Sequence, residues 1–161
     1  MLILPRNRWV RGLLWACRSD VGSGEQIIHA SAVALNGAAV CICGASGSGK
    51  SALALQLMAM GCDLVADDGC RIWRDGPALW LDTPDTIRGR IEARGIGILN
   101  ADAVGPSQVA LWVDLDQVET HRLPPKREKV CLGVSRPILH NMQAQHFAAA
   151  ILQYLKAGRF A

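Results

Sequence analysis

The sequence predicts a single α/β domain, in which a mixed β-sheet is entered by an antiparallel hairpin and carries two helices. Three observations lead to this fold class. Two short apolar runs flank an Asn-Gly pair, a segment of good helix formers follows the glycine-rich run GASGSGKS, and residues 141–158 are again rich in helix formers. A chain of 161 residues has the length of one domain.

The hairpin is predicted at residues 32–44, AVALNGAAVCICG. Asn-Gly between two apolar runs is a strong hairpin signal, because both central residues of a type I′ turn need a positive φ. Cys41 and Cys43 alternate along the second strand, so they are expected to be buried on the same face. The helix that follows the glycine-rich run is predicted to end at Gly61, since glycine is common just after a last helical residue.

The second half of the chain predicts further strands and the C-terminal helix. DLVADD (63–68) is expected to be a buried strand, CRIWRDGPALWL (70–81) a hairpin turning at Asp75 and Gly76, and VALWVDL (109–115) a later strand. Residues 83–94 fit either a loop or a helix. The helix predicted over residues 141–158 places most of these side chains on one face: Met142, Phe147, Ile151, Leu152 and Leu155.

Composition and charge restrict the class of protein. Half of the residues are hydrophobic and 19% are charged, as in a soluble globular chain. The net charge is only +3 and the basic residues are dispersed, so no nucleic-acid partner is expected, and the basic run at 126–129 is interpreted as a solvated loop. No C-x-x-C pair occurs among the six cysteines, which favours reduced thiols.

No segment approaches the ~18 apolar residues of a membrane span, so we expect a cytoplasmic protein with no membrane partner. Arginines and a proline interrupt the apolar N-terminus before a signal peptide could form. Residues 1–24 are expected to be a peripheral segment, and residues 25–161 the domain itself.

GASGSGKS, at residues 44–51, matches the phosphate-loop pattern G-x-x-x-x-G-K-[ST] at every defined position, between a predicted strand and a predicted helix. In such a loop the backbone N–H groups and the helix N-terminus converge on phosphate oxygens. A mere glycine-rich turn is the competing interpretation, and the matching context favours nucleotide binding. The predicted nucleotide-binding residues are Gly44, Ala45, Ser46, Gly47, Ser48, Gly49, Lys50 and Ser51.

Four segments, in this order and spacing, resemble the catalytic domain of the HPr kinase/phosphorylase family: HA at His29, GASGSGKS, LVADD and IEARGIGILN. The resemblance covers residues 29–156 and corresponds to a short form without the N-terminal domain. It implies a P-loop fold of the phosphoenolpyruvate carboxykinase-like type, assembled as a hexamer. It also implies an ATP- and Mg²⁺-dependent serine kinase that phosphorylates the phosphocarrier protein HPr in phosphotransferase-system regulation, with a reverse phosphorolysis that yields pyrophosphate.

The resemblance also assigns roles to single residues. Lys50 binds phosphate, Ser51 and Glu92 are the Mg²⁺ ligands, and Asp68 is the proton acceptor of the kinase reaction. On a regular strand Asp67 and Asp68 would point to opposite faces, which leaves Asp67 for Mg²⁺ and its water shell, although the two assignments could be exchanged. The predicted catalytic residues are Asp68, Asp67, His29, Lys50, Arg122 and Arg94.

Ordinary interpretations compete for three of these residues. An isolated histidine such as His29 is more often a surface or core residue, and most lone glutamates such as Glu92 are merely solvated. Arg94 fits a turn between strands, and Arg122, in THRLP, matches the family arginine only weakly.

Two departures from the family pattern affect the expected activity. Ala52 replaces a glutamate after the phosphate loop, and Leu139 and His140 stand where the family has Gly and Arg in a segment tied to phosphorolysis. We therefore expect weak or absent phosphorolysis. A related P-loop kinase with another protein or small-molecule substrate, or a non-catalytic nucleotide-binding regulator, remain alternatives.

Overall fold

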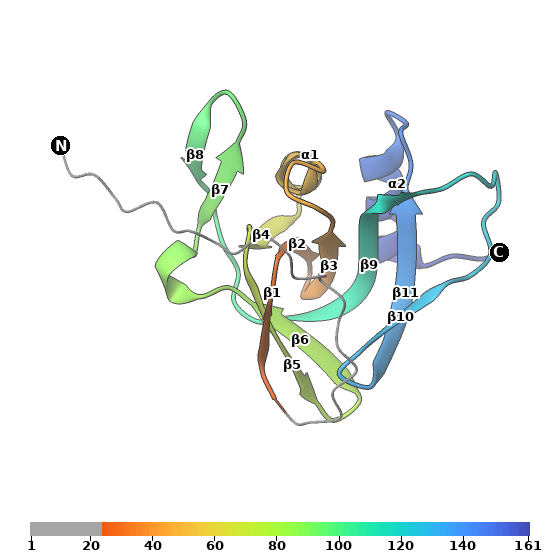
Figure 1. Cartoon of the computed structure of the whole chain (residues 1–161), viewed down its shortest axis with the longest axis horizontal. Helices are drawn as coiled ribbons and strands as arrows, with labels where there is room; N and C mark the ends of the chain where they lie inside the picture. Colours follow the sequence, from red (N-terminus) through yellow and green to blue (C-terminus); the bar gives the residue numbers. More distant parts are fainter. Residues whose placement is uncertain (1–23) are drawn as a thin grey trace.

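The computed structural model describes residues 24–161 and is built around a mixed β-sheet (Figure 1). The prediction that the first 24 residues are peripheral concerns a segment almost wholly outside these described residues. The nine-stranded sheet runs β1-β5-β6-β9-β3-β2-β4, with β11 beside β9 and β10 beside β11. Its strands are β1 (Gln26–Ile28), β2 (Ala30–Leu35), β3 (Ala38–Cys43), β4 (Asp63–Ala66), β5 (Cys70–Asp75), β6 (Ala78–Asp82), β9 (Ser107–Val118), β10 (Glu128–Cys131) and β11 (Val134–Asn141).

The pairing of these strands makes the sheet mixed, as predicted. β9 runs parallel to both β3 and β11, while the other neighbours are antiparallel. The predicted hairpin is confirmed as β2 and β3, because Leu35 pairs with Ala38 and both turn residues, Asn36 and Gly37, have positive φ angles of 50° and 82°. The sheet therefore reaches the glycine-rich loop through an antiparallel hairpin.

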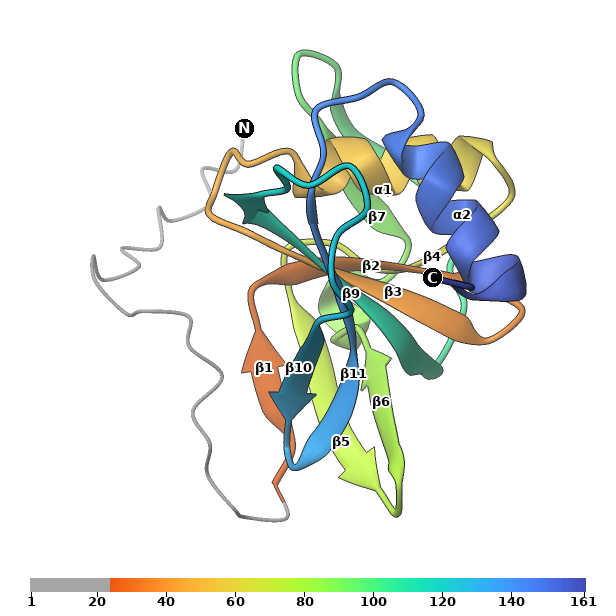
Figure 2. The ribbon, with the colours of Figure 1, turned by 90° about the vertical axis from the view of Figure 1, so that its right-hand side faces the viewer.

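Two helices lie against one side of the sheet (Figure 2). Helix α1 (Lys50–Ala59) follows the glycine-rich loop, and Gly61 has the positive φ of 103° that suits a residue just past a helix end. Helix α2 (Phe147–Ala157) lies beside α1 near the C-terminus. A separate two-stranded sheet, β7 (Arg90–Ala93) with β8 (Gly97–Asn100), rises next to α1 (Figure 1).

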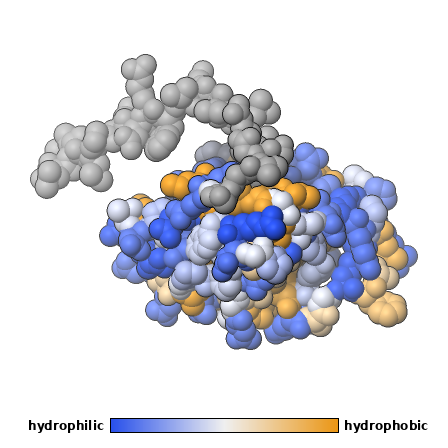
Figure 3. Space-filling view, turned by 90° about the horizontal axis from the view of Figure 1, so that it is seen from below, coloured by the Kyte–Doolittle hydropathy of each residue, from blue (hydrophilic) through white to orange (hydrophobic). Residues whose placement is uncertain are grey.

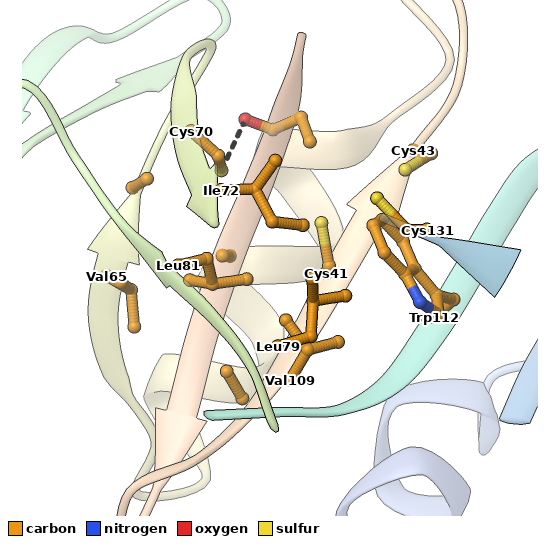
Figure 4. Packing of buried hydrophobic residues seen from close by; sticks show 14 of the residues in the cluster. Cys41, Cys43, Val65, Cys70, Ile72, Leu79, Leu81, Val109, Trp112 and Cys131 are labelled. Atoms are coloured by element: carbon orange, nitrogen blue, oxygen red, sulfur yellow. Dashed lines mark hydrogen bonds between the residues drawn. The ribbon is translucent and has the colours of Figure 1, made fainter. Parts of the chain in front are cut away.

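The alternation of β3 divides the apolar interior into two cores. Val40 and Ile42 face the helices, while Cys41 and Cys43 face the opposite core together with Trp112, as Figure 4 shows. The two thiols therefore share one buried face, as expected. Burial raises the pKa of Cys41, and the hydrogen bond with Cys41 together with burial raises that of Cys43, so both remain protonated thiols.

Several element boundaries differ from the prediction. The predicted C-terminal helix begins only at Phe147, because Asn141 ends β11 and Met142 lies in the connection between them. The 70–81 hairpin turns at Gly76 and Pro77 rather than one residue earlier, since Asp75 pairs with Ala78. Residues 83–94 contain both a short 3₁₀ helix (Asp85–Ile87) and strand β7.

The sequence predicts that the basic run at 126–129 is a solvated loop, and the structure differs from this prediction. Arg127 forms an ion pair with Glu119, and the Lys129 ammonium lies 4.7 Å from the centre of the Trp112 ring. Hydrogen bonding from Arg127 lowers the pKa of Glu119 to about 2. The Arg127–Glu119 pair joins the two ends of the connection between β9 and β10, and Lys129 of β10 lies against Trp112 of β9.

The surface of the described residues is mainly polar at the end of the molecule seen in Figure 3, with smaller apolar areas between. Ile27 and Val130 are exposed aliphatic side chains. Such side chains are normal on the surface of folded domains. Among residues 24–161, no helix has the length and apolar character needed to cross a membrane.

Candidate active site

The glycine-rich loop leaves β3 at its carboxyl end and leads directly into α1. At Gly44, with φ 152°, an added Cβ would lie 2.5 Å from Ser48 Oγ, so the first loop position requires glycine. Helix α1 has neither a side-chain cap nor an acidic residue in its first turn, which agrees with the alanine at position 52. Its N-terminal N–H groups are therefore suited to an anionic ligand.

Lys50 is a buried cation at the start of this helix. Its Nζ donates hydrogen bonds to the carbonyl oxygens of Gly44 (2.9 Å) and Ala45 (3.0 Å). Burial lowers the pKa of Lys50, whereas the carboxylates of Asp68, Asp116 and Asp67 act in the opposite direction. The ammonium group is thus held against the phosphate loop by two of its carbonyl groups, and the three acidic residues favour its charged form.

Asp67 lies just past the end of β4 and is only 7% exposed. Its Oδ1 accepts hydrogen bonds from Ser31 Oγ and Ser51 Oγ, both at 2.7 Å, and its Oδ2 accepts one from the backbone N–H of Glu92 at 2.9 Å. Asp67 therefore links β2, the start of α1 and β7. The sequence interpretation missed Ser31, although a lone hydroxyl in an apolar strand signals a buried polar partner.

Asp68 points into a different environment from its neighbour. Strand β4 ends at Ala66, and Asp68 has a left-handed φ of 64°, so this turn rather than strand alternation separates the two carboxylates. The Asp68 side chain is 79% exposed, and its Oδ1 lies 3.0 Å from His29 Nδ1. His29 Nδ1 also lies 3.1 Å from the Asp68 carbonyl oxygen, so the histidine contacts both the backbone and the carboxylate of this residue. The carboxylate remains accessible to a second reactant.

The β7–β8 hairpin forms the other wall of the site. Ala93 pairs with Gly97, so Arg94 stands in a turn between strands, as the competing interpretation proposed. The same turn brings Arg94 to the phosphate loop, because its terminal nitrogen lies 3.6 Å from the position of a Cβ on Gly47. Arg94 is thus both a turn residue and a part of the site.

A cavity of about 350 Å³ brings most of the predicted residues together. It is lined by His29, Ser46, Gly47, Gly49, Lys50, Ser51, Ala52, Leu55, Asp68, Glu92, Ala93 and Arg94. Asp67 does not line the cavity, but it accepts a hydrogen bond from Ser51, which does line it. Arg122 does not line the cavity either, since it lies exposed in the connection between β9 and β10.

The side chains around the loop fit a magnesium nucleotide. Ser48 Oγ is buried within the loop without a hydrogen-bond partner among the described residues, as expected for a group that awaits a ligand. Within residues 24–161 no three His, Cys, Asp or Glu side chains are grouped to hold a metal by themselves. Mg²⁺ at nucleotide sites commonly takes only one or two protein ligands besides phosphate oxygens and water. Ser51 and Glu92, the residues predicted to hold it, both line the cavity.

Two further acidic residues at the end of β9 were missed by sequence reasoning. Asp116 accepts hydrogen bonds from the Ala45 backbone N–H at 3.0 and 3.1 Å, one to each carboxylate oxygen. Asp114 Oδ1 accepts a hydrogen bond from the Asp116 N–H at 2.9 Å. The available signal was a D-x-D pattern closing an apolar strand, because carboxyl ends of parallel strands gather around bound ligands.

The segment that departs from the family pattern lies outside the main cavity. Leu139 and His140 belong to β11, beside Val113 and Asp114 of β9, and line a second cavity of about 220 Å³ next to α2. Asn141, which matches the family, donates a hydrogen bond from Nδ2 to the Leu115 carbonyl oxygen at 3.1 Å.

Comparisons with known proteins give the chain a family. The HPr kinase/phosphorylase of Azoarcus sp. (strain BH72) is 36% identical over 124 residues, which cover 68% of this chain and 40% of that protein. The one from Streptococcus pneumoniae (strain Hungary19A-6) is 38% identical over 103 residues, covering 59% and 33%. The chain therefore spans well under half the length of these curated relatives.

The fold has a solved counterpart. The structure of the HPr(Ser) kinase/phosphatase from Coxiella burnetii matches with a TM-score of 0.69 at 23% identity, covering 81% of this chain and 94% of that one. This likeness confirms the predicted α/β fold class. The family model of the HPr Serine kinase C-terminal domain matches residues 22–122, and the chain belongs to that family.

Proposed function

We propose that this domain transfers the γ-phosphoryl group of ATP, with Mg²⁺, to a serine hydroxyl of the phosphocarrier protein HPr. The observation that carries the proposal is the exposed Asp68 carboxylate, which shares one cavity with Lys50 and Ser51. A phosphate-binding wall thus faces a carboxylate that an incoming hydroxyl can reach. Membership of the HPr Serine kinase family supports HPr as the acceptor protein.

Five side chains of the cavity have a task in this reaction. Asp68 accepts the proton of the serine hydroxyl, and His29 holds that carboxylate in place through its Nδ1. Lys50 and the loop amides bind the phosphate oxygens, while Ser51 and Glu92 hold Mg²⁺. When bound, Mg²⁺ neutralises charge on the β- and γ-phosphates.

Asp67 is proposed to act behind this surface. Its carboxylate accepts a hydrogen bond from the Ser51 hydroxyl, which leaves the oxygen lone pairs of Ser51 free for a metal. This arrangement supports the assignment of Asp67 to the Mg²⁺ shell and of Asp68 to proton transfer.

Phosphotransfer to HPr with labelled ATP and Mg²⁺ tests the proposal. We expect Lys50→Ala to abolish transfer, because the phosphate site loses its cation. Asp68→Asn should keep ATP affinity and slow transfer by at least the ~10²-fold typical of losing a general base. HPr with its acceptor serine replaced by alanine is the control, and absence of transfer over a range of Mg²⁺ and metabolite concentrations would contradict the proposal.

The kinase direction is proposed to dominate. Leu139 and His140 replace the Gly and Arg of the family segment tied to phosphorolysis, so phosphate-dependent release of pyrophosphate from phosphorylated HPr should be weak. Robust release would contradict this part. A related kinase with another acceptor would retain every feature of the cavity, and would show transfer to a different substrate under the same conditions. By family resemblance we also propose that the protein forms a hexamer and lies in the cytoplasm. Sedimentation of the purified protein tests the hexamer.

A further inference from the structure

The first peptide unit of the phosphate loop is held at both ends by charged side chains. The Gly44 carbonyl oxygen accepts a hydrogen bond from Lys50 Nζ at 2.9 Å, and the Ala45 N–H of the same peptide donates to the Asp116 carboxylate at 3.0 and 3.1 Å. The Lys50 ammonium, the Gly44–Ala45 peptide and the Asp116 carboxylate thus form one chain of hydrogen bonds. Hydrogen bonds in such a series polarise and strengthen one another.

The anchor itself is fixed by the sheet. Asp116 lies in β9 just past Asp114, the last residue of β9 that pairs with the parallel strand β3, and the Asp116 N–H donates to Asp114 Oδ1 at 2.9 Å. Cys43 at the end of β3 pairs with Asp114, so the phosphate loop begins beside this pair of aspartates. The Asp116 carboxylate is held where the loop leaves the sheet.

The entry to the loop needs such an anchor. Gly44 has a φ of 152°, and glycine imposes little preference of its own on the orientation of the following peptide. Rotation of that peptide would turn its carbonyl group away from Lys50. One of the two carbonyl groups that hold the ammonium, that of Gly44, therefore depends on the acceptor at the opposite end of the peptide; the other is that of Ala45.

We propose that Asp116 is a positioning residue, which holds the entry of the phosphate loop and, through the Gly44–Ala45 peptide, the Lys50 ammonium in the geometry that receives phosphate. The inference rests on the proposed nucleotide binding and adds a residue to it. Asp116 is outside the cavity lining and acts through the backbone.

Two effects of the Asp116 charge oppose each other. Its carboxylate repels a bound phosphate, but the side chain is exposed, where water and salt screen such repulsion. Loss of a charged hydrogen-bond acceptor from the loop is the larger effect. The carboxylate also favours the protonated form of Lys50, against the lowering of its pKa by burial.

Three variants separate the hydrogen bond from the charge. Asp116→Ala removes both, Asp116→Asn keeps an oxygen that accepts from Ala45, and Asp75→Ala removes an equal charge from β5. Affinity for MgATP, measured by calorimetry, should fall about 10-fold in Asp116→Ala and stay within about 3-fold of the wild type in the other two. Transfer at saturating MgATP should also fall in Asp116→Ala, because the Lys50 ammonium is displaced, and should stay near the wild-type rate in Asp116→Asn, a rescue that a general loss of structure would not give.

A second readout needs no nucleotide. In the empty protein, hydrogen exchange at the Ala45 amide should be at least about 10-fold faster in Asp116→Ala than in the wild type, and nearly unchanged in Asp116→Asn. Unchanged exchange and unchanged affinity in Asp116→Ala would overturn the inference, as would an equal loss in Asp116→Asn. A wild-type protein that does not bind MgATP would instead refute the proposed function, while exchange at Ala45 would still decide whether Asp116 anchors the loop.

Discussion

Replacing Asp67 by alanine should destabilise the fold itself, because its carboxylate joins three elements that are distant in the sequence. The side chain accepts hydrogen bonds from Ser31 in β2, from Ser51 in α1 and from the Glu92 N–H in β7. Without it, each of these donors must find water or remain unpaired. The cost depends on how deeply each donor is buried.

The burial of the donors gives the magnitude. Ser31 is 0% exposed, so its orphaned hydroxyl costs about 1–3 kcal/mol. The bonds from Ser51 and the Glu92 N–H are only partly buried, and water can replace Asp67 there, so about 0.5–1 kcal/mol is lost for each. We expect a loss of about 3 kcal/mol in the free energy of unfolding, or roughly 6–12 °C in Tm for a domain of this size.

Asp67→Asn is the matched control, because the amide can satisfy the same three groups. Its oxygen can accept from the Glu92 N–H, and its NH₂ group can donate to the hydroxyl oxygens of Ser31 and Ser51, which then accept. Stability should fall by less than about 1 kcal/mol. The Ser51 oxygen, however, now uses a lone pair on the amide, so Mg²⁺-dependent nucleotide binding should still weaken.

Urea unfolding of the wild type and both variants at pH 7 measures the difference directly. A loss smaller than about 1 kcal/mol in Asp67→Ala would show that the network does not support the fold. Equal destabilisation by alanine and asparagine would show that the charge, rather than the hydrogen bonds, is what the site requires.

Two other predictions concern the loop and the connection after β9. Gly44→Ala should weaken nucleotide binding at least about 10-fold in calorimetry, since the added Cβ would lie 2.5 Å from Ser48 Oγ, while Gly105→Ala, with open space around it, should not. Glu119→Gln should lower stability at neutral pH, because hydrogen bonding from Arg127 lowers the Glu119 pKa from 4.5 to about 2. The stability that the Glu119 carboxylate contributes is fully present above its pKa in the unfolded chain, 4.5, and is lost as the pH falls through its pKa in the folded protein, about 2. The difference in stability between Glu119→Gln and the wild type should therefore vanish between pH 4.5 and 2. A difference that persists below pH 2 in thermal unfolding would refute the assignment.

Local signals explain what could be predicted of the fold. The turn at Asn36 and Gly37 and the helix after the phosphate loop depend on neighbouring residues, and both were correct. The end of β11 was missed because its strand character comes from pairing with β9, which nothing within residues 134–141 encodes. Helix propensity in the segment that follows then extended the predicted helix too far.

The candidate site shows the same division between local and distant information. Lys50 and Asp68 fall in recognisable motifs, whereas Asp116 meets the loop 71 positions along the chain from Ala45. That contact follows from β9 lying beside β3, and the sequence predicted both strands without their order in the sheet. Arg122 carried the weakest motif match, and like Asp67 it does not line the cavity; it is exposed in the connection between β9 and β10.

The turn after β4 also decides how Asp68 should be studied. Because Asp68 has a φ of 64°, a residue that resists the left-handed region would alter the backbone as well as the chemistry. Asparagine tolerates this conformation, so Asp68→Asn changes the charge of the side chain and little else. A valine at the same position would strain the turn and shift Asp67, and with it Ser51, so its effect on transfer could not be assigned to proton transfer alone.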